Sequence, residues 1–165
     1  MFTSISEQNF LLSHIDENKT VLEYGSGAST IELANICKNI VSVEHQKSWY
    51  DQLMLSIPSN CVLILKEPNA YYTEGGDDGT YEQFHEYVRC PLSYGNFDII
   101  LIDGRARMAC ASVCNMIGHK DTLIFIHDFH RAEYQGCLEF FDLIELVDTM
   151  AKFKMKSIFL DKRKQ

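Results

Sequence analysis

A short segment near the N-terminus constrains the fold more than any other feature of the sequence. Residues 20–24 form an apolar strand candidate that runs directly into Gly25-Ser26-Gly27 and a helix candidate at 29–37. Glycines in such a turn let the backbone reverse sharply and approach a ligand, and the amides at the helix N-terminus then face that ligand. Glu44 follows about 20 residues later, where an acidic side chain can hold both hydroxyls of a ribose. This combination predicts a site for an adenosine-containing cofactor.

The rest of the chain alternates short apolar runs with longer amphipathic ones. Continuous runs such as residues 99–102 are typical of parallel strands that are covered on both faces. The alternation predicts an α/β fold with a Rossmann-like, doubly wound, mostly parallel sheet and helices on both faces. The expected strands are 20–24, 40–44, 61–66, 97–103, 122–128, 144–149 and 156–160, and the expected helices are 6–15, 29–37, 47–57, 106–117 and 133–141. Because the last two strands are close in sequence, we expect them to form an antiparallel hairpin at one edge.

The chain has no linker or internal repeat, so we expect one domain over residues 1–165. Residues 70–95 are the one long stretch without a strong pattern, with a glycine-rich core at 75–79 and a short helix candidate at 81–88. Long irregular segments in compact domains are often functional, and this one is a candidate substrate lid.

The composition limits the binding partners and the cellular location that we expect for this chain. The net charge of −8 disfavours nucleic acid, because binding to phosphates needs a basic face. No segment approaches the ~20 apolar residues of a membrane span, which predicts no membrane partner and a cytoplasmic location. Most of the six cysteines lie in apolar periodic stretches, so we expect reduced, buried thiols.

The glycine turn also discriminates between adenosine cofactors. Dinucleotide sites prefer a third glycine beside the pyrophosphate, and Thr30 stands at that position here. Glu23 would sit poorly beside a pyrophosphate but well beside an ammonium or sulfonium group, which favours S-adenosylmethionine over NAD. The predicted cofactor-binding residues are Glu23, Gly25, Ser26, Gly27, Thr30, Glu44, His45 and Asp103.

Two acids end neighbouring strand candidates and define the expected reaction centre. Asp103 and Asp128 should meet at the carboxyl edge of the sheet, where they would repel each other unless a cation lay between them. An alcohol is a poor nucleophile at neutral pH, and a bound metal can lower the pKa of a coordinated oxygen. We therefore expect both acids to bind a divalent cation, Mg²⁺ or Mn²⁺. The alternatives are that Asp103 caps the next helix and that Asp128 pairs with Arg105 or Arg131.

Histidines and arginines cluster around these acids. His127 and His130 flank Asp128 and are candidate bases or metal ligands, together with Asp103 and Asp128 as the catalytic set. Arginines can clamp a carboxylate or phosphate bidentately, or they can pair with nearby acids. The predicted substrate-binding residues are Arg105, Arg107 and Arg131.

Three motifs together resemble the class I S-adenosylmethionine-dependent methyltransferases: Glu23-x-Gly25-x-Gly27-x-x-Thr30, Val43-Glu44, and the run from Phe97 to Gly104. The resemblance covers roughly residues 20 to 160. It implies a seven-stranded sheet with a reversed final hairpin. It also implies that Glu23, Gly25 and Gly27 line the methionine part of the cofactor, that Glu44 holds the ribose, and that residues 67–69 flank the adenine.

The region around the acids resembles narrower groups. Catechol-type and several sugar O-methyltransferases place metal-binding acids after the fourth and fifth strands, as Asp103 and Asp128 are placed here. This chain departs from the catechol type in having His127-Asp128 in place of Asp-Asn, and it has Ala106 where some sugar methyltransferases have a histidine. The longer motif that combines residues 103–111 with residues 127–134 is similar to that of a methyltransferase-like group. Relatives of this group are found near glycan-modifying enzymes and include plant glucuronoxylan methyltransferases and sugar methyltransferases of large DNA viruses.

We therefore expect an S-adenosylmethionine-dependent O-methyltransferase that acts on a hydroxyl of a sugar or glycan. The alternatives are a methyltransferase for a phenol or an amine and a non-catalytic module that binds the cofactor. The Asn/Asp-Pro-Pro-Tyr/Phe signature of base N-methylation is absent after residue 102. A dehydrogenase is disfavoured by Thr30.

Overall fold

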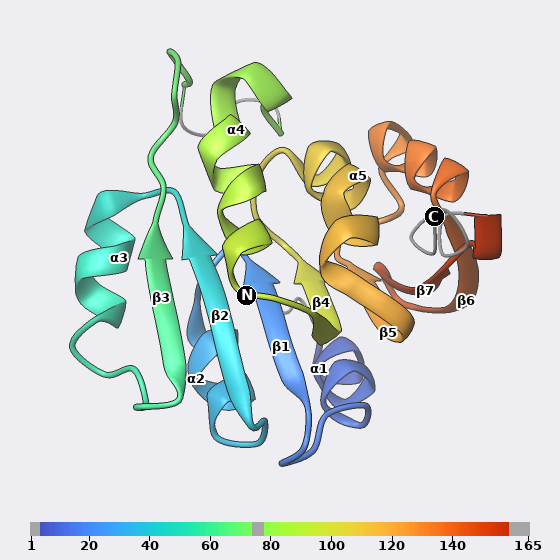
Figure 1. The fold of residues 1–165 in the computed structure, drawn as a ribbon, viewed down its shortest axis with the longest axis horizontal. Helices are drawn as coiled ribbons and strands as arrows, with labels where there is room; N and C mark the ends of the chain where they lie inside the picture. Colours follow the sequence, from blue (N-terminus) through green and yellow to red (C-terminus); the bar gives the residue numbers. More distant parts are fainter. Residues whose placement is uncertain (1–3, 74–77, 159–165) are drawn as a thin grey trace.

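The computed structural model describes residues 4–73 and 78–158 and is built around a seven-stranded sheet (Figure 1). The strands are β1 Thr20–Tyr24, β2 Asn39–Glu44, β3 Cys61–Leu65, β4 Phe97–Ile102, β5 Gly118–Ile126, β6 Phe141–Val147 and β7 Met150–Met155. Their order across the sheet is β3-β2-β1-β4-β5-β7-β6. Strands β1 to β5 pair in parallel, and β7 runs antiparallel to both β5 and β6. The predicted doubly wound sheet with a reversed C-terminal hairpin is confirmed.

Helices cover both faces of this sheet (Figure 1). They are α1 Ile5–Leu12, α2 Ala28–Ala34, α3 Lys47–Leu53, α4 Tyr81–Arg89 and α5 Arg107–Ile117, with the 3-10 helices η1 Cys90–Ser93 and η2 Ala132–Glu139. Because alternate side chains of a strand point to opposite faces, β1 contributes to two cores. Leu22 packs in the core that holds α4, α5 and η2, and Val21 packs in the core that holds α1, α2 and α3.

The strand order reverses at the centre of the sheet. Strand β1 pairs with β2 on one side and with β4 on the other, and the chain reaches β4 only after leaving β3 at the sheet edge. Ligand sites of open α/β sheets form in the crevice at such a switch point, outside the carboxyl ends of the strands. Here these ends are Tyr24, Glu44 and Ile102.

The segment 70–95 contains the short helix that its sequence predicts at 81–88. Its second half forms α4 and η1, and Phe84, Tyr87 and Val88 are fully buried in the core. These residues recur at helical spacing, so α4 is the helix that carries the chain from β3 across the sheet to β4. Residues 74–77, which include the first two glycines of the predicted flexible core, lie outside the described residues.

The C-terminal elements are also shifted from their predicted places. The final strand is expected at 156–160 but lies at Met150–Met155, and the segment expected to be helical at 133–141 is a 3-10 helix. Lysines hide the true strand, because Lys152 interrupts its apolar pattern. The Lys152 stem is nevertheless buried, and its ammonium donates to the Glu145 carboxylate at 2.6 Å.

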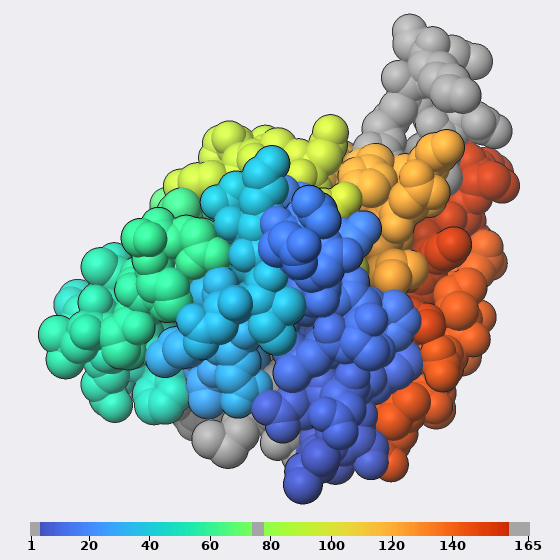
Figure 2. Space-filling view, turned by 90° about the horizontal axis from the view of Figure 1, so that it is seen from below, coloured from blue at the N-terminus to red at the C-terminus, as the bar shows by residue number. Residues whose placement is uncertain are grey.

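Helix α1 and the turn of the C-terminal hairpin meet on one side of the molecule. Seen from below, the N-terminal segment lies beside the segments of the C-terminal hairpin (Figure 2). Glu7 in α1 accepts hydrogen bonds from the amide and the hydroxyl of Thr149, at 2.8 and 2.6 Å. None of the helices within residues 4–73 and 78–158 is long and apolar enough to cross a membrane.

Candidate active site

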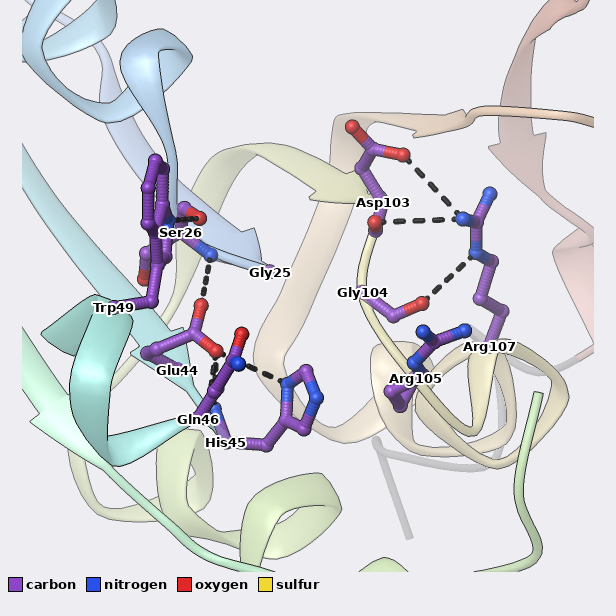
Figure 3. Close-up of a pocket in the computed structure, with 10 residues that line it drawn as sticks. All are labelled: Gly25, Ser26, Glu44, His45, Gln46, Trp49, Asp103, Gly104, Arg105 and Arg107. Carbon is purple, nitrogen blue, oxygen red and sulfur yellow. Dashed lines mark hydrogen bonds and ion pairs between the residues drawn. The ribbon is translucent and has the colours of Figure 1, made fainter. Parts of the chain in front are cut away.

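A cavity of about 260 Å³ opens at the switch point, at the carboxyl ends of β1, β2 and β4 (Figure 3). Ten residues from these strand ends and the helices that follow them line the cavity: Gly25, Ser26, Glu44, His45, Gln46, Trp49, Asp103, Gly104, Arg105 and Arg107. The cavity therefore collects five of the eight residues that the sequence assigns to the cofactor, namely Gly25, Ser26, Glu44, His45 and Asp103.

Two glycines allow the floor of this cavity to form. Gly25 has a φ of 94°, and a Cβ atom on it would lie 2.5 Å from the Cα of Gly104. A Cβ atom on Gly104 would in turn lie 2.9 Å from the Cα of Gly25. The turns after β1 and β4 thus pack backbone against backbone, and any larger residue at either position would force them apart. Gly27 does not line the cavity and begins α2 in an extended conformation.

Glu44 presents its carboxylate at the side of the cavity and is 3% exposed. One oxygen accepts from the amide of Ser26 at 3.0 Å, and the other accepts from the amides of His45 and Gln46 at 2.9 and 2.7 Å. These bonds fix the carboxylate against the glycine turn, as the dashed lines in Figure 3 show. Glu44 therefore joins the end of β2 to the loop after β1.

Glu23 does not take the place that the sequence predicts for it. Its carboxylate is fully buried below the glycine turn, where it accepts from Ser29, Ser42 and Thr30 at 2.6, 2.6 and 2.5 Å. Burial raises the pKa of Glu23 to about 7, although these hydrogen bonds lower it. Thr30, also predicted to contact the cofactor, is buried and accepts from the amide of Gly27 at 2.9 Å. Both residues hold the turn from beneath and do not line the cavity.

A second hollow of about 370 Å³ shares His45 and Gln46 with the first. It is bounded on its far side by Glu67, Pro68 and Tyr72, which follow β3. The two hollows adjoin at His45 and Gln46, and together we call them the cleft along the carboxyl ends of the strands from β4 to β3. Residues 67–68, expected from the family resemblance to flank an adenine, therefore lie at one end of the cleft.

Asp103 lies at the other end of the cleft and is supported from behind by a histidine. His127 Nδ1 is 2.8 Å from the Asp103 carboxylate, and its Nε2 is 3.3 Å from the carboxylate of Glu7. Burial alone would raise the pKa of Asp103, but the hydrogen bond and charge of His127 outweigh it and lower that pKa. Burial alone would lower the pKa of His127, but the neighbouring carboxylates raise it. His127, predicted as a catalytic base, has both ring nitrogens against carboxylates, an arrangement that favours its protonated form, and lies behind Asp103.

The sequence predicts a divalent metal between Asp103 and Asp128, and the donor set does not fit one. The guanidinium of Arg107 lies 3.5 Å from the Asp103 carboxylate and 3.3 Å from that of Asp128. Among the described residues, no group of three or more His, Cys, Asp or Glu side chains could hold a metal ion. The cation that the two acids require is therefore an arginine, and Asp128 pairs with Arg107 rather than with Arg105 or Arg131.

The remaining predicted residues divide between the cleft and the surface. Arg105 lines the cavity, and its guanidinium lies 5.7 Å from the ring centroid of Tyr72. Arg107 also lines it but is 6% exposed and bound to the protein on several sides. His130 and Arg131 are exposed and line neither hollow, and Arg131 donates to the hydroxyl of Tyr134 at 3.1 Å. The catalytic role predicted for His130 and the substrate contact predicted for Arg131 do not fit these positions.

Sequence reasoning missed three residues that line the cavity, namely Gly104, Gln46 and Trp49. Trp49 in α3 donates from Nε1 to the carbonyl of Ser26 at 2.7 Å, and Gln46 precedes that helix. The one available signal for Gln46 and Trp49 was position, because both follow Glu44 closely and so begin the helix that leaves the site.

Known proteins share this architecture but little of the sequence. No protein-family model matches the chain, and no curated protein matches it either. A methyltransferase-like protein from Silicibacter pomeroyi superposes with a TM-score of 0.77 at 20% identity, over 94% of this chain and 88% of that one. The N-methyltransferase NodS from Bradyrhizobium japonicum, in complex with S-adenosyl-L-homocysteine, gives 0.58 at 13% identity, over 90% and 86%. A precorrin 8w decarboxylase from Methanobacterium thermoautotrophicum gives 0.63 at 12% identity, over 94% and 92%.

These similarities show that the chain has the fold of class I S-adenosylmethionine-dependent methyltransferases. The names of the similar proteins cover different chemistries, so the acceptor has to be argued from the site.

Proposed function

We propose that this chain is an S-adenosylmethionine-dependent methyltransferase that transfers the methyl group to a hydroxyl of a sugar or other small glycan. The observation that carries the proposal is the convergence of Gly25, Glu44 and Asp103 on one cleft at the switch point of a methyltransferase fold. The glycine turn leaves backbone space, Glu44 offers a carboxylate to ribose hydroxyls, and Asp103 places a second carboxylate at the end of the cleft.

The two hollows suggest which residues would hold each part of the cofactor. Gly25 and Ser26 would border the methionine part, and Glu44 would accept from the ribose hydroxyls. His45, Pro68 and Tyr72 would enclose the adenine in the second hollow, where flat side chains suit a flat base. Sites for cofactors commonly combine such surfaces with a few fixed polar groups.

The chemistry requires little of the protein beyond orientation and one proton acceptor. When bound, S-adenosylmethionine supplies a methyl group on a positively charged sulfur, which is already a good leaving group. The acceptor oxygen becomes strongly acidic as its bond to carbon forms, so a carboxylate of lowered pKa is basic enough to take the proton. Asp103 is the carboxylate placed for this role, and no step here needs a metal.

The surroundings of Asp103 support a small acceptor. Arg105 lines the same hollow as Asp103 and offers a cation, which suits an acidic sugar. The net charge of −8 supports a small molecule or a glycan rather than a nucleic acid. An amine is the second candidate, because a carboxylate of lowered pKa would also attract an ammonium group.

Isothermal titration calorimetry tests the cofactor assignment. S-adenosylhomocysteine should bind one site per chain, and NAD should not bind. Glu44→Gln keeps an acceptor atom but loses the charge, so affinity should fall roughly 10- to 100-fold. Glu139→Gln, which alters an exposed acid on η2, is the matched control and should leave affinity unchanged. Equal affinity in Glu44→Gln and wild type would refute the role of Glu44.

Transfer of a labelled methyl group tests the acceptor. Panels of neutral sugars, uronic acids, nucleotide sugars, phenols and amines should yield label only in a sugar class. Transfer to amines alone would replace the proposal by its second candidate. Cofactor binding without transfer to any panel would favour a binding module.

A further inference from the structure

Arg107 stands where the sequence predicts a divalent metal. We propose that its guanidinium is a built-in cation that binds Asp103 and Asp128 together, positions Asp103 in the cleft, and makes the site independent of a metal. The positioning role rests on the proposed function, whereas the replacement of a metal can be measured without it.

Every part of the guanidinium is engaged by the protein. Nε donates to the carbonyl of Gly104 at 3.1 Å, Nη1 donates to the carbonyl of His127, and Nη2 lies 3.4 Å from the carbonyl of Asp103. The two carboxylates of Asp103 and Asp128 lie 3.5 and 3.3 Å away. The group is thus bound to the ends of β4 and β5 at once.

The Arg107 guanidinium also contacts side chains from two other parts of the chain. The carboxylate of Asp78 is 3.8 Å from Nε, and the ring of Tyr134 in η2 lies 5.2 Å from the guanidinium carbon. Arg107 is only 6% exposed, so these interactions act with little screening by water. A planar cation with five donors can satisfy such a set of acceptors, which a lysine could not.

The position of Arg107 in its helix is unfavourable for a positive charge, so the acids around it must compensate. Arg107 is the first residue of α5, where the helix dipole disfavours a positive charge. The preceding Ala106 has a left-handed backbone with φ 50°, a costly conformation for a residue with a side chain. Asp78, Asp103 and Asp128 together offset both effects, so the cation and its acids form one unit.

The same unit disfavours a divalent ion. A second cation between Asp103 and Asp128 would lie within a few ångströms of the buried guanidinium, where charges repel strongly in a medium of low polarity. The acids would also have to give up their bonds to Arg107. Removing the guanidinium should have the opposite effect, because Asp103 and Asp128 would lose one cationic partner and keep the nearby His127 ring, at 2.8 and 3.8 Å.

Titration with Mn²⁺, followed by electron paramagnetic resonance, measures this directly. Wild type should bind no Mn²⁺ up to millimolar concentration. Arg107→Ala should gain one site, with a dissociation constant of about 10⁻⁴ to 10⁻³ M as in sparse oxygen-ligated sites. The double variant Arg107→Ala/Asp128→Asn should lose that site again. Arg105→Ala removes the same charge two positions away and should gain no site, which controls for net charge.

Measurements of kcat distinguish a role of Arg107 in positioning Asp103 from a purely structural role. With the proposed acceptor, wild-type activity should be insensitive to EDTA. Arg107→Ala should lower kcat about 100-fold, as expected for a misplaced reacting group, while affinity for S-adenosylhomocysteine changes less than about threefold. Mn²⁺ should restore part of this kcat in Arg107→Ala, and Arg107→Lys should retain part of it without binding Mn²⁺.

One site for Mn²⁺ in wild type that Asp128→Asn abolishes would overturn the proposal, and so would loss of wild-type activity in EDTA. If Arg107→Ala folds only when Mn²⁺ is present, that dependence supports the proposal. If it does not fold at all, the wild-type Mn²⁺ titration decides alone, with absence of binding in support. Failure of S-adenosylhomocysteine to bind would refute the proposed function and leave the Mn²⁺ result standing.

Discussion

Glu23 carries a carboxyl group that the fold buries completely. Its pKa is raised to about 7, so the folded chain holds a proton on Glu23 that the unfolded chain, with a value near 4.5, has lost. Stability from this group is present below pH 4.5 and is lost as the pH rises towards 7. This rise in pKa corresponds to about 3 kcal/mol at most.

Glu23→Gln should remove this pH dependence, because an amide has no charge to bury. The free energy of unfolding, measured with urea from pH 5 to pH 8, should decline less steeply in the variant than in wild type. Glu139→Gln, at an exposed acid, should keep the wild-type slope. Parallel profiles for Glu23→Gln and wild type would show that Glu23 is ionised throughout.

At this scale the sequence located the site better than it assigned the roles. Gly25, Glu44 and Asp103 were predictable because each ends or follows a strand, and strand ends converge in this fold. Glu23 and His127 were misassigned because sequence position does not reveal which way a side chain leaves the strand end. Both point into buried networks, and their partners come from other elements.

Asp78 shows how elements far apart in sequence are joined at the site. The local cap of α5 is missing, because Ala106 has no side chain able to accept a hydrogen bond. Asp78, in the segment between β3 and α4, supplies it instead and accepts from the amide of Arg107 at 2.7 Å. Its other oxygen accepts from the hydroxyl of Tyr134 at 3.0 Å. One carboxylate thus connects three elements around the cleft.

Asp78→Ala should lower the free energy of unfolding by about 1–3 kcal/mol, from the loss of a helix cap and a charged hydrogen bond. Asp78→Asn keeps an acceptor oxygen and should lose less. Asp121→Ala, at an acid whose side chain is 72% exposed, is the control and should be close to neutral. Urea denaturation at pH 7 measures all three. No change in Asp78→Ala would mean that water replaces these bonds at no cost.

The elements themselves were predictable where the pattern was strong. Strands β1 to β4 lie within a residue or two of their expected bounds, because buried parallel strands are continuously apolar. The crossover helix α4, expected at 81–88, lies at Tyr81–Arg89, because its apolar residues recur at helical spacing. The final strand was misplaced because the stem of Lys152 is buried there while its ammonium group reaches Glu145 outside the core.

For the molecule as a whole, α1 connects the turn of the C-terminal hairpin to the site. Glu7 is fully buried and lies 142 positions from Thr149, its hydrogen-bond donor in the turn between β6 and β7. Its other oxygen faces His127, which supports Asp103. Sequence patterns carry no signal for such a pairing, because a glutamate in a leading helix reads as a solvated residue. The contact follows only from how the sheet brings these elements together.

Glu7→Gln should therefore act on global stability and on His127 together. The pKa of His127 is raised, so its stabilising contribution is present below its ordinary value of 6.5 and is lost as the pH rises through the folded value. Removing the charge of Glu7 takes away one cause of that rise. The His127 titration midpoint, followed by nuclear magnetic resonance, should fall. The free energy of unfolding at pH 6 should drop by about 3–5 kcal/mol, as when a buried pair loses one member, and by less at higher pH.

Glu17→Gln, at an exposed acid just after α1, is the control and should change neither the His127 midpoint nor the free energy of unfolding. An unchanged His127 midpoint in Glu7→Gln would show that Asp103 and Asp128 raise the pKa of His127 without Glu7.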